Sequence, residues 1–183
     1  MSEISERYAR RASAFAEKVA AVSEDQWAAP SPCEDWTARD VVGHVVQSQG
    51  MFLGFVGREM GEHPSVDDDP EGAVRAVTGR IQQDLEDPEL AAQTFEGFMG
   101  TQAFEASVDQ FLAADLLIHG WDLARATGQD DTIPAQDLAE MREAIKQFPE
   151  EAMRSPGAFG PEVPVAEDAS DQDKLMGFLG RKP

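Results

Sequence analysis

The sequence predicts an all-α fold in which four main helices form a bundle. Apolar residues recur near every 3.6 positions in several long segments, which is the pattern of helices that bury one face. The second of these segments, which ends near Val56, is apolar around much of its girth and is typical of a central bundle helix. The connectors between the second, third and fourth helices run to about 15 residues, more than a plain up-down bundle needs, so we expect a crossover arrangement.

The first predicted helix covers residues 3–22, and its inward face is formed by Ile4, Tyr8, Phe15, Val19 and Val22. A Ser-x-x-Gln capping pattern at 23–26 then predicts a short helical turn that carries Trp27 to the core. Two closely spaced prolines, Pro30 and Pro32, make the next segment an irregular connector, because proline forbids a regular helix.

The second helix begins at a capping box, Thr37-Ala-Arg-Asp40. Residues 61–70 read as a solvated loop, and the acidic run Asp67–Asp69 within it lacks the ligand spacing of a calcium loop. The third helix covers residues 70–87, with Pro70 in its first turn, and Pro88 ends it.

The segment 88–101 is compatible with either a short extended piece or a loop. A long fourth helix follows from about 101 to 127 and is closed by Gly128. A short fifth helix fits residues 135–148. We therefore expect a helical bundle over residues 1–154 and a tail over 155–183 that packs back on it.

The net charge of −20 and the pI near 4.3 exclude nucleic acids and anionic membrane surfaces as partners, because both are bound through lysine and arginine. The single cysteine, Cys33, excludes an intramolecular disulfide and fits a reducing compartment. No apolar run approaches the roughly 20 residues of a membrane span, and the N-terminus has no apolar signal segment. We expect a cytoplasmic protein, for which a homodimer is one possible assembly.

A candidate metal site lies in the fourth helix, where Asp115 and His119 are one turn apart on one face. Apolar residues surround the pair, and a buried carboxylate is costly unless an imidazole or a metal satisfies it. His44, inside the second helix, would complete a set of two histidines and one carboxylate with a position open to water or substrate. The alternative is that each histidine is an ordinary core residue with its own hydrogen-bond partner.

Other polar residues allow two interpretations each. Asp122 either accepts a hydrogen bond from an imidazole or lies on a solvated face with Arg125 or Lys146. Cys33 is either a nucleophile near a helix N-terminus or a small buried hydrophobe, with no histidine near it in sequence to act as a base. Two tryptophans, Trp36 and Trp121, are core aromatics or walls of the metal pocket, and His63 is expected to be exposed.

Two segments carry a resemblance to a known family: WAAPSPCEDWTARDVVGH at 27–44 and DLLIHGWDLARATG at 115–128. They resemble the DinB-like metal-binding superfamily, and within it the actinobacterial branch related to mycothiol-dependent maleylpyruvate isomerase. The region from Pro156 to Arg181 also looks like that branch. The resemblance implies a bundle of up-down-down-up topology and a divalent metal, zinc or else nickel, held by three residues. The matching positions are His44, Asp115 and His119.

The resemblance implies a metal-dependent enzyme that uses a low-molecular-weight thiol, mycothiol or similar, for S-transfer to a small electrophile or for its isomerisation. The isomerase usually has glutamate where this chain has Asp115, and it has a further C-terminal domain, where only about 35 residues follow the fifth helix here. The negative charge disfavours anionic substrates unless the metal and Arg39 or Arg125 offset it. The alternatives are a metal-hydroxide hydrolase and a non-catalytic metal-binding or stress-response module.

Overall fold

The computed structural model describes residues 2–97, 100–148, 153–154 and 159–183, and divides the chain into two compact units. The first unit ends at Asp131 and the second begins at Thr132. Both helices that carry the predicted site residues belong to the first unit, a helical bundle. None of the described helices is long and apolar enough to cross a membrane.

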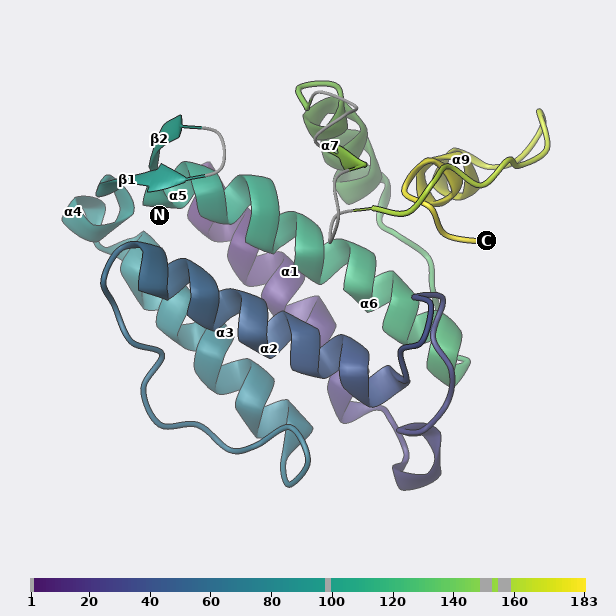
Figure 1. The fold of residues 1–183 in the computed structure, drawn as a ribbon, viewed down its shortest axis with the longest axis horizontal. Helices are drawn as coiled ribbons and strands as arrows, with labels where there is room; N and C mark the ends of the chain where they lie inside the picture. Colours follow the sequence, from purple (N-terminus) through teal and green to yellow (C-terminus); the bar gives the residue numbers. More distant parts are fainter. Residues whose placement is uncertain (1, 98–99, 149–152, 155–158) are drawn as a thin grey trace. The chain divides into compact units, whose positions relative to one another are not determined.

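Four helices make up the bundle: α1 (Glu3–Ala20), α2 (Ala38–Phe55), α3 (Pro70–Glu86) and α6 (Ala113–Thr127). Both α1 and α2 pack against α3 and α6, so that α1 and α2 lie across the bundle from each other. The chain runs one way along α1 and α6 and the opposite way along α2 and α3 (Figure 1). The all-α bundle and its up-down-down-up topology are therefore confirmed.

A long loop between α2 and α3 makes this topology possible, because it returns the chain to the end of the bundle where α2 began (Figure 1). Arg39, in the first turn of α2, donates to the carbonyl oxygen of Val66 at 2.6 Å, shortly before α3 begins. At the other end, Arg58 follows α2 and pairs with Asp84 near the end of α3. The predicted crossover is confirmed, and it places α2 and α3 parallel.

The helix starts follow the local chemistry of the sequence. Thr37 Oγ1 accepts from the backbone N–H of Asp40, which closes one side of the capping box. The Asp40 carboxylate accepts from the hydroxyl of Thr37 and from its backbone N–H, and these two hydrogen bonds lower the pKa of the Asp40 carboxyl. Asp69 caps α3 ahead of Pro70. Gly128, with φ of 67°, ends α6 in the left-handed conformation that glycine adopts without strain. A 3₁₀ turn, η1 (Glu24–Gln26), occupies the predicted short turn.

The segment left open by the sequence contains a helical turn, α4 (Pro88–Ala91), and an antiparallel hairpin of β1 (Thr94–Gly97) and β2 (Gly100–Ala103). The hairpin corrects the predicted start of the fourth helix at 101, since β2 holds the chain extended to Ala103. From there α5 (Phe104–Ser107) and a π-helical turn, η2 (Val108–Leu112), lead directly into α6.

The second unit contains α7 (Ala135–Ile145) and α9 (Asp171–Phe178), which contact each other. Arg142 of α7 pairs with Asp171 at 2.5 Å. The sequence predicts the first of these helices, over 135–148, but not the second. The packing of the tail on the bundle stays a prediction, and residues 156–158 of the Pro156–Arg181 pattern lie outside the described part of the chain.

Candidate metal centre

The candidate centre starts from α6, which presents Asp115, His119 and Asp122 along one side. Spacings of four and three residues bring side chains together on one helix face. The side chains of Asp122 and His119 are 0% and 8% exposed, while that of Asp115 is 22% exposed. The Nε2 atom of His119 lies 3.2 Å from Oδ1 of Asp115.

The second histidine comes from α2, which packs against α6. His44 Nε2 lies 3.4 Å from the same Oδ1 of Asp115, and the two imidazole rings are 4.8 Å apart in an edge-on arrangement. One potential ligand atom from each of His44, Asp115 and His119 lies within 4.8 Å of the other two. The three residues predicted as a set therefore converge, although about 70 residues of chain separate the two helices.

The charges of the cluster depend on each other. Burial opposes the charged form of Asp115, but His119 and then His44 outweigh it and hold the pKa of this carboxyl well below its ordinary value. Burial would likewise lower the pKa of His119, but Asp115 outweighs it, with help from Asp122 and Cys33, and raises that pKa well above the ordinary value. A cation next to Asp115, whether a proton on His119 or a metal, is thus favoured.

The other side of the His119 ring is held by Asp122. Its Oδ2 atom lies 2.9 Å from Nδ1 of His119 and also 3.3 Å from Sγ of Cys33, which donates to it. A carboxylate at Nδ1 fixes the ring so that Nε2 faces Asp115 and His44, the arrangement that orients metal-binding histidines in proteins. Of the two interpretations of Asp122, the structure favours the imidazole partner over the solvated face.

The loop before α2 brings Cys33 and Trp36 to this cluster. A bridge between Pro30 and Thr37 closes the loop, and Asp35 takes a φ of 63°, a conformation that aspartate tolerates in turns. The Trp36 ring lies 4.9 Å from the His44 ring and 5.8 Å from the His119 ring. Trp36 therefore walls the site, whereas Trp121 is buried with Arg125 stacked on its ring.

A metal ion fits this donor set. Asp115 Oδ2 is buried and has no hydrogen-bond partner in the described part of the chain, so the carboxylate has a ligating atom to spare. Two imidazoles and a carboxylate are common zinc ligands. A second group, Cys33, His119 and Asp122, is also close enough to hold an ion. We prefer the first, because Asp122 already accepts from both of its neighbours.

Other candidates lie apart from the cluster. His63 is held at its own loop, with Nδ1 2.8 Å from the carbonyl oxygen of Pro64. Arg39 binds Val66 and Asp67, and Arg125 pairs with Asp131 at 3.2 Å. The sequence interpretation missed Ser48, whose hydroxyl lies 3.3 Å from Nε2 of His44. Its position four residues after His44 was the available indication.

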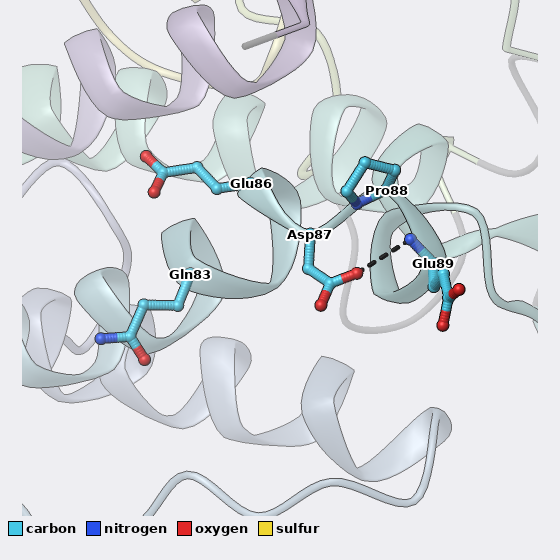
Figure 2. Close-up of a pocket in the computed structure, with 5 residues that line it drawn as sticks. All are labelled: Gln83, Glu86, Asp87, Pro88 and Glu89. Carbon is cyan, nitrogen blue, oxygen red and sulfur yellow. Dashed lines mark hydrogen bonds between the residues drawn. The ribbon is translucent and has the colours of Figure 1, made fainter.

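A surface hollow at the corner of α3 and α4 is lined by Gln83, Glu86, Asp87, Pro88 and Glu89 (Figure 2). The backbone N–H of Glu89 donates to Asp87 Oδ1 at 2.9 Å, so this carboxylate caps α4. The carboxylates here are exposed to water. Asp87 therefore has a structural role in this hollow as the cap of α4, and no histidine is among the described residues that line it.

Residues 8–124 match the family model described as the mycothiol maleylpyruvate isomerase N-terminal domain. Two curated relatives, uncharacterized proteins of Mycobacterium tuberculosis strains CDC 1551 and H37Rv, are each 30% identical to the chain over 173 residues. The alignments cover 94% of this chain and 94% of each relative. No solved structure matches the chain significantly. The matched region contains His44, Asp115, His119 and Asp122.

Proposed function

The chain belongs to the family of the mycothiol maleylpyruvate isomerase N-terminal domain, and from this premise we propose that it is a divalent-metal-dependent enzyme acting with a low-molecular-weight thiol. The reaction is S-transfer to a small electrophile or its thiol-assisted isomerisation. One observation supports the proposal above all others: the convergence of His44, Asp115 and His119, with one buried oxygen of Asp115 left without a partner in the described chain.

The metal, zinc or else nickel, would be held by His44, Asp115 and His119. Such an ion supplies positive charge that favours the thiolate form of a bound thiol, which is the reactive form. Asp122 holds the ring of His119 from behind, and Trp36 covers the imidazoles. In this proposal the three ligands hold the metal, Asp122 fixes the orientation of His119, and Trp36 keeps water from one side of the site.

The nucleophile in this proposal is the sulfur of the small thiol. The thiol gives up its proton to solvent, its sulfur bonds to the electrophilic carbon, and the displaced group departs with its electron pair. In an addition to a double bond, the neighbouring carbon takes a proton instead. Cys33 is not needed as the nucleophile, because its thiol donates to Asp122, which positions His119.

We propose an uncharged electrophile. The chain carries a net charge of −20, and the two arginines considered as local counter-charges both have acidic partners, Asp67 for Arg39 and Asp131 for Arg125. The net negative charge of the chain disfavours the approach of anionic substrates and leaves neutral ones unaffected.

The test is a thiol-consumption assay with zinc-loaded protein, using mycothiol or cysteine as the thiol. A neutral aryl halide and an unsaturated dicarboxylate serve as alternative electrophiles. We expect turnover with the neutral electrophile that disappears in chelator and in His44→Ala, while His63→Ala retains it. Absence of thiol consumption together with hydrolysis of esters would replace the proposal with a hydrolase. Absence of any turnover, despite bound metal, would favour the non-catalytic module.

A further inference from the structure

We propose that Ser48 is a ligand-binding residue. Its hydroxyl hydrogen-bonds to the small ligand that enters at the open side of the metal centre, which in the proposed reaction is a thiol sulfur. This inference rests on the proposed metal site and adds to it the direction from which a ligand arrives and the group that receives it.

The exposure of the three converging side chains indicates where the open side lies. His119 is 8% exposed and is covered from behind by Asp122, whereas Asp115 is 22% exposed and His44 is 34% exposed. Solvent therefore reaches the cluster from the side of His44. His44 is thus the most exposed of the three converging side chains, and its side of the cluster is where a small molecule would approach.

Ser48 lies on that side. It is half-buried, one turn after His44 on α2, and its Oγ is 3.3 Å from Nε2 of His44. The same Nε2 atom lies 3.4 Å from Asp115 Oδ1, so the hydroxyl borders the point of convergence directly. Among the described residues, the hydroxyl of Ser48 lies within hydrogen-bond distance of one of the two converging imidazole nitrogens.

The present hydrogen bond of Ser48 cannot coexist with ligation through the same atom. A neutral imidazole nitrogen has one lone pair, and when Nε2 of His44 is used for ligation it can no longer accept from a hydroxyl. The Ser48 hydroxyl is then free to donate to another acceptor. Its alternative acceptor is the backbone carbonyl one turn earlier, the usual partner of a serine in a helix. If the hydroxyl donates to the ligand, its removal weakens ligand binding; if it donates to the carbonyl, its removal leaves ligand binding unchanged.

The experiment measures binding of 2-mercaptoethanol to the cobalt-loaded protein by visible absorption, together with the metal content of each variant. Ser48→Ala should bind cobalt as the wild type does. It should raise the dissociation constant of 2-mercaptoethanol about five- to tenfold, which is the effect of losing one ordinary hydrogen bond. Ser48→Thr keeps a hydroxyl and should restore affinity to within about twofold of wild type. Ser13→Ala, an exposed serine of α1 bonded to Glu17, is the matched control.

Three results would count against the inference or its premise. Unchanged affinity in Ser48→Ala, with cobalt bound, overturns the role of Ser48 and leaves the metal site intact. Loss of cobalt from Ser48→Ala also overturns it, because the hydroxyl would then support the ion rather than the incoming ligand. Failure of the wild type to bind cobalt at all overturns the proposed function itself.

Discussion

Two carboxylates in the same bundle, Asp84 of α3 and Asp115 of α6, have opposite environments. Asp84 is 1% exposed and is paired through both oxygens, with Arg58 at 2.7 Å and with Arg80. Arg58 is itself fixed by the Leu90 carbonyl and the Gln93 side chain. Asp115 has two imidazoles as partners, and one of its oxygens is buried without a partner in the described chain.

The difference lies in the partners. A guanidinium keeps its proton at any physiological pH and has no lone pair to offer a metal, so the Asp84 cluster is complete as it stands. An imidazole can release its proton and ligate, so the Asp115 cluster can exchange a proton for a metal ion. We infer that Asp84 stabilises the fold and that Asp115 serves the function, and this contrast can be tested at each member.

The largest effect on stability is expected at Asp84. Asp84→Asn removes the charge that pairs with Arg58, whose side chain is 10% exposed, and leaves a nearly buried cation without its counter-ion. We expect a loss of about 3–5 kcal/mol in the free energy of unfolding, measured by chemical denaturation. The loss should be the same with and without chelator, and a dependence on chelator would contradict a purely structural role.

The histidines should behave differently. In the presence of zinc at about 100 times its dissociation constant, bound metal adds roughly 2.7 kcal/mol to stability, which His44→Ala or His119→Ala would forfeit. Chelator should remove this part of the difference between each variant and the wild type. His63→Ala, in the loop after α2, is the control and should respond to zinc as the wild type does. Equal differences in zinc and in chelator would indicate two unrelated core histidines.

A smaller effect is expected at Asp122. Asp122→Asn keeps the size of the side chain but weakens its hydrogen bond to Nδ1 of His119 and so loosens the orientation of the ring. We expect zinc affinity to fall about 10–100-fold without being abolished, measured by competition with a chromophoric chelator. Unchanged affinity would show that Asp122 does not orient the ligand.

The smallest effect is a pH dependence of the metal-free protein. The folded pKa of His119 is raised, so its stabilising contribution is complete below the unfolded value of about 6.5 and is lost as the pH rises through the folded value. The folded pKa of Asp115 is lowered, so its contribution is complete above an unfolded value of about 3.9 and is lost on acidification. In chelator, the stability difference between wild type and His119→Gln should be largest between the two unfolded pKa values, about 3.9 and about 6.5, and should shrink toward alkaline pH.

The same titration predicts the opposite trend for metal affinity. A proton on His119 must leave before Nε2 can ligate, so zinc affinity should rise with pH over the range in which the difference in chelator shrinks. The Asp84 cluster serves as the reference for this pH comparison, because its arginines stay charged over the whole pH range. If the difference in unfolding free energy between wild type and His119→Gln in chelator stays constant from pH 6 to pH 9, the raised pKa of His119 is contradicted.

Much of the fold could be predicted because its signals are local. Apolar periodicity gave the bundle helices, and capping residues such as Thr37 and Gly128 gave their ends to within a few residues. The hairpin of β1 and β2 could not be predicted from the sequence, because its strands are short and pair with each other rather than with a larger sheet. The helix α9 was missed because its eight residues contain a glycine and lack a strong apolar period.

The site shows the same division. The i,i+4 spacing of Asp115 and His119 is readable from one helix, but the arrival of His44 depends on how α2 packs against α6. Cys33 and Trp36 reach the cluster through the shape of an irregular loop, and no spacing rule predicts that. The exposure gradient that singles out Ser48 exists only in the folded chain.

Elemental analysis of protein purified without chelators tests the central claim most directly. We expect about one divalent metal ion per chain in the wild type and in His63→Ala, and little or none in His44→Ala, Asp115→Ala and His119→Ala, because three ligands from two helices hold the ion together. A wild-type protein that contains no metal, and takes up none when zinc is supplied, would contradict the account. A metal content that is unaffected by all three ligand substitutions would contradict it equally.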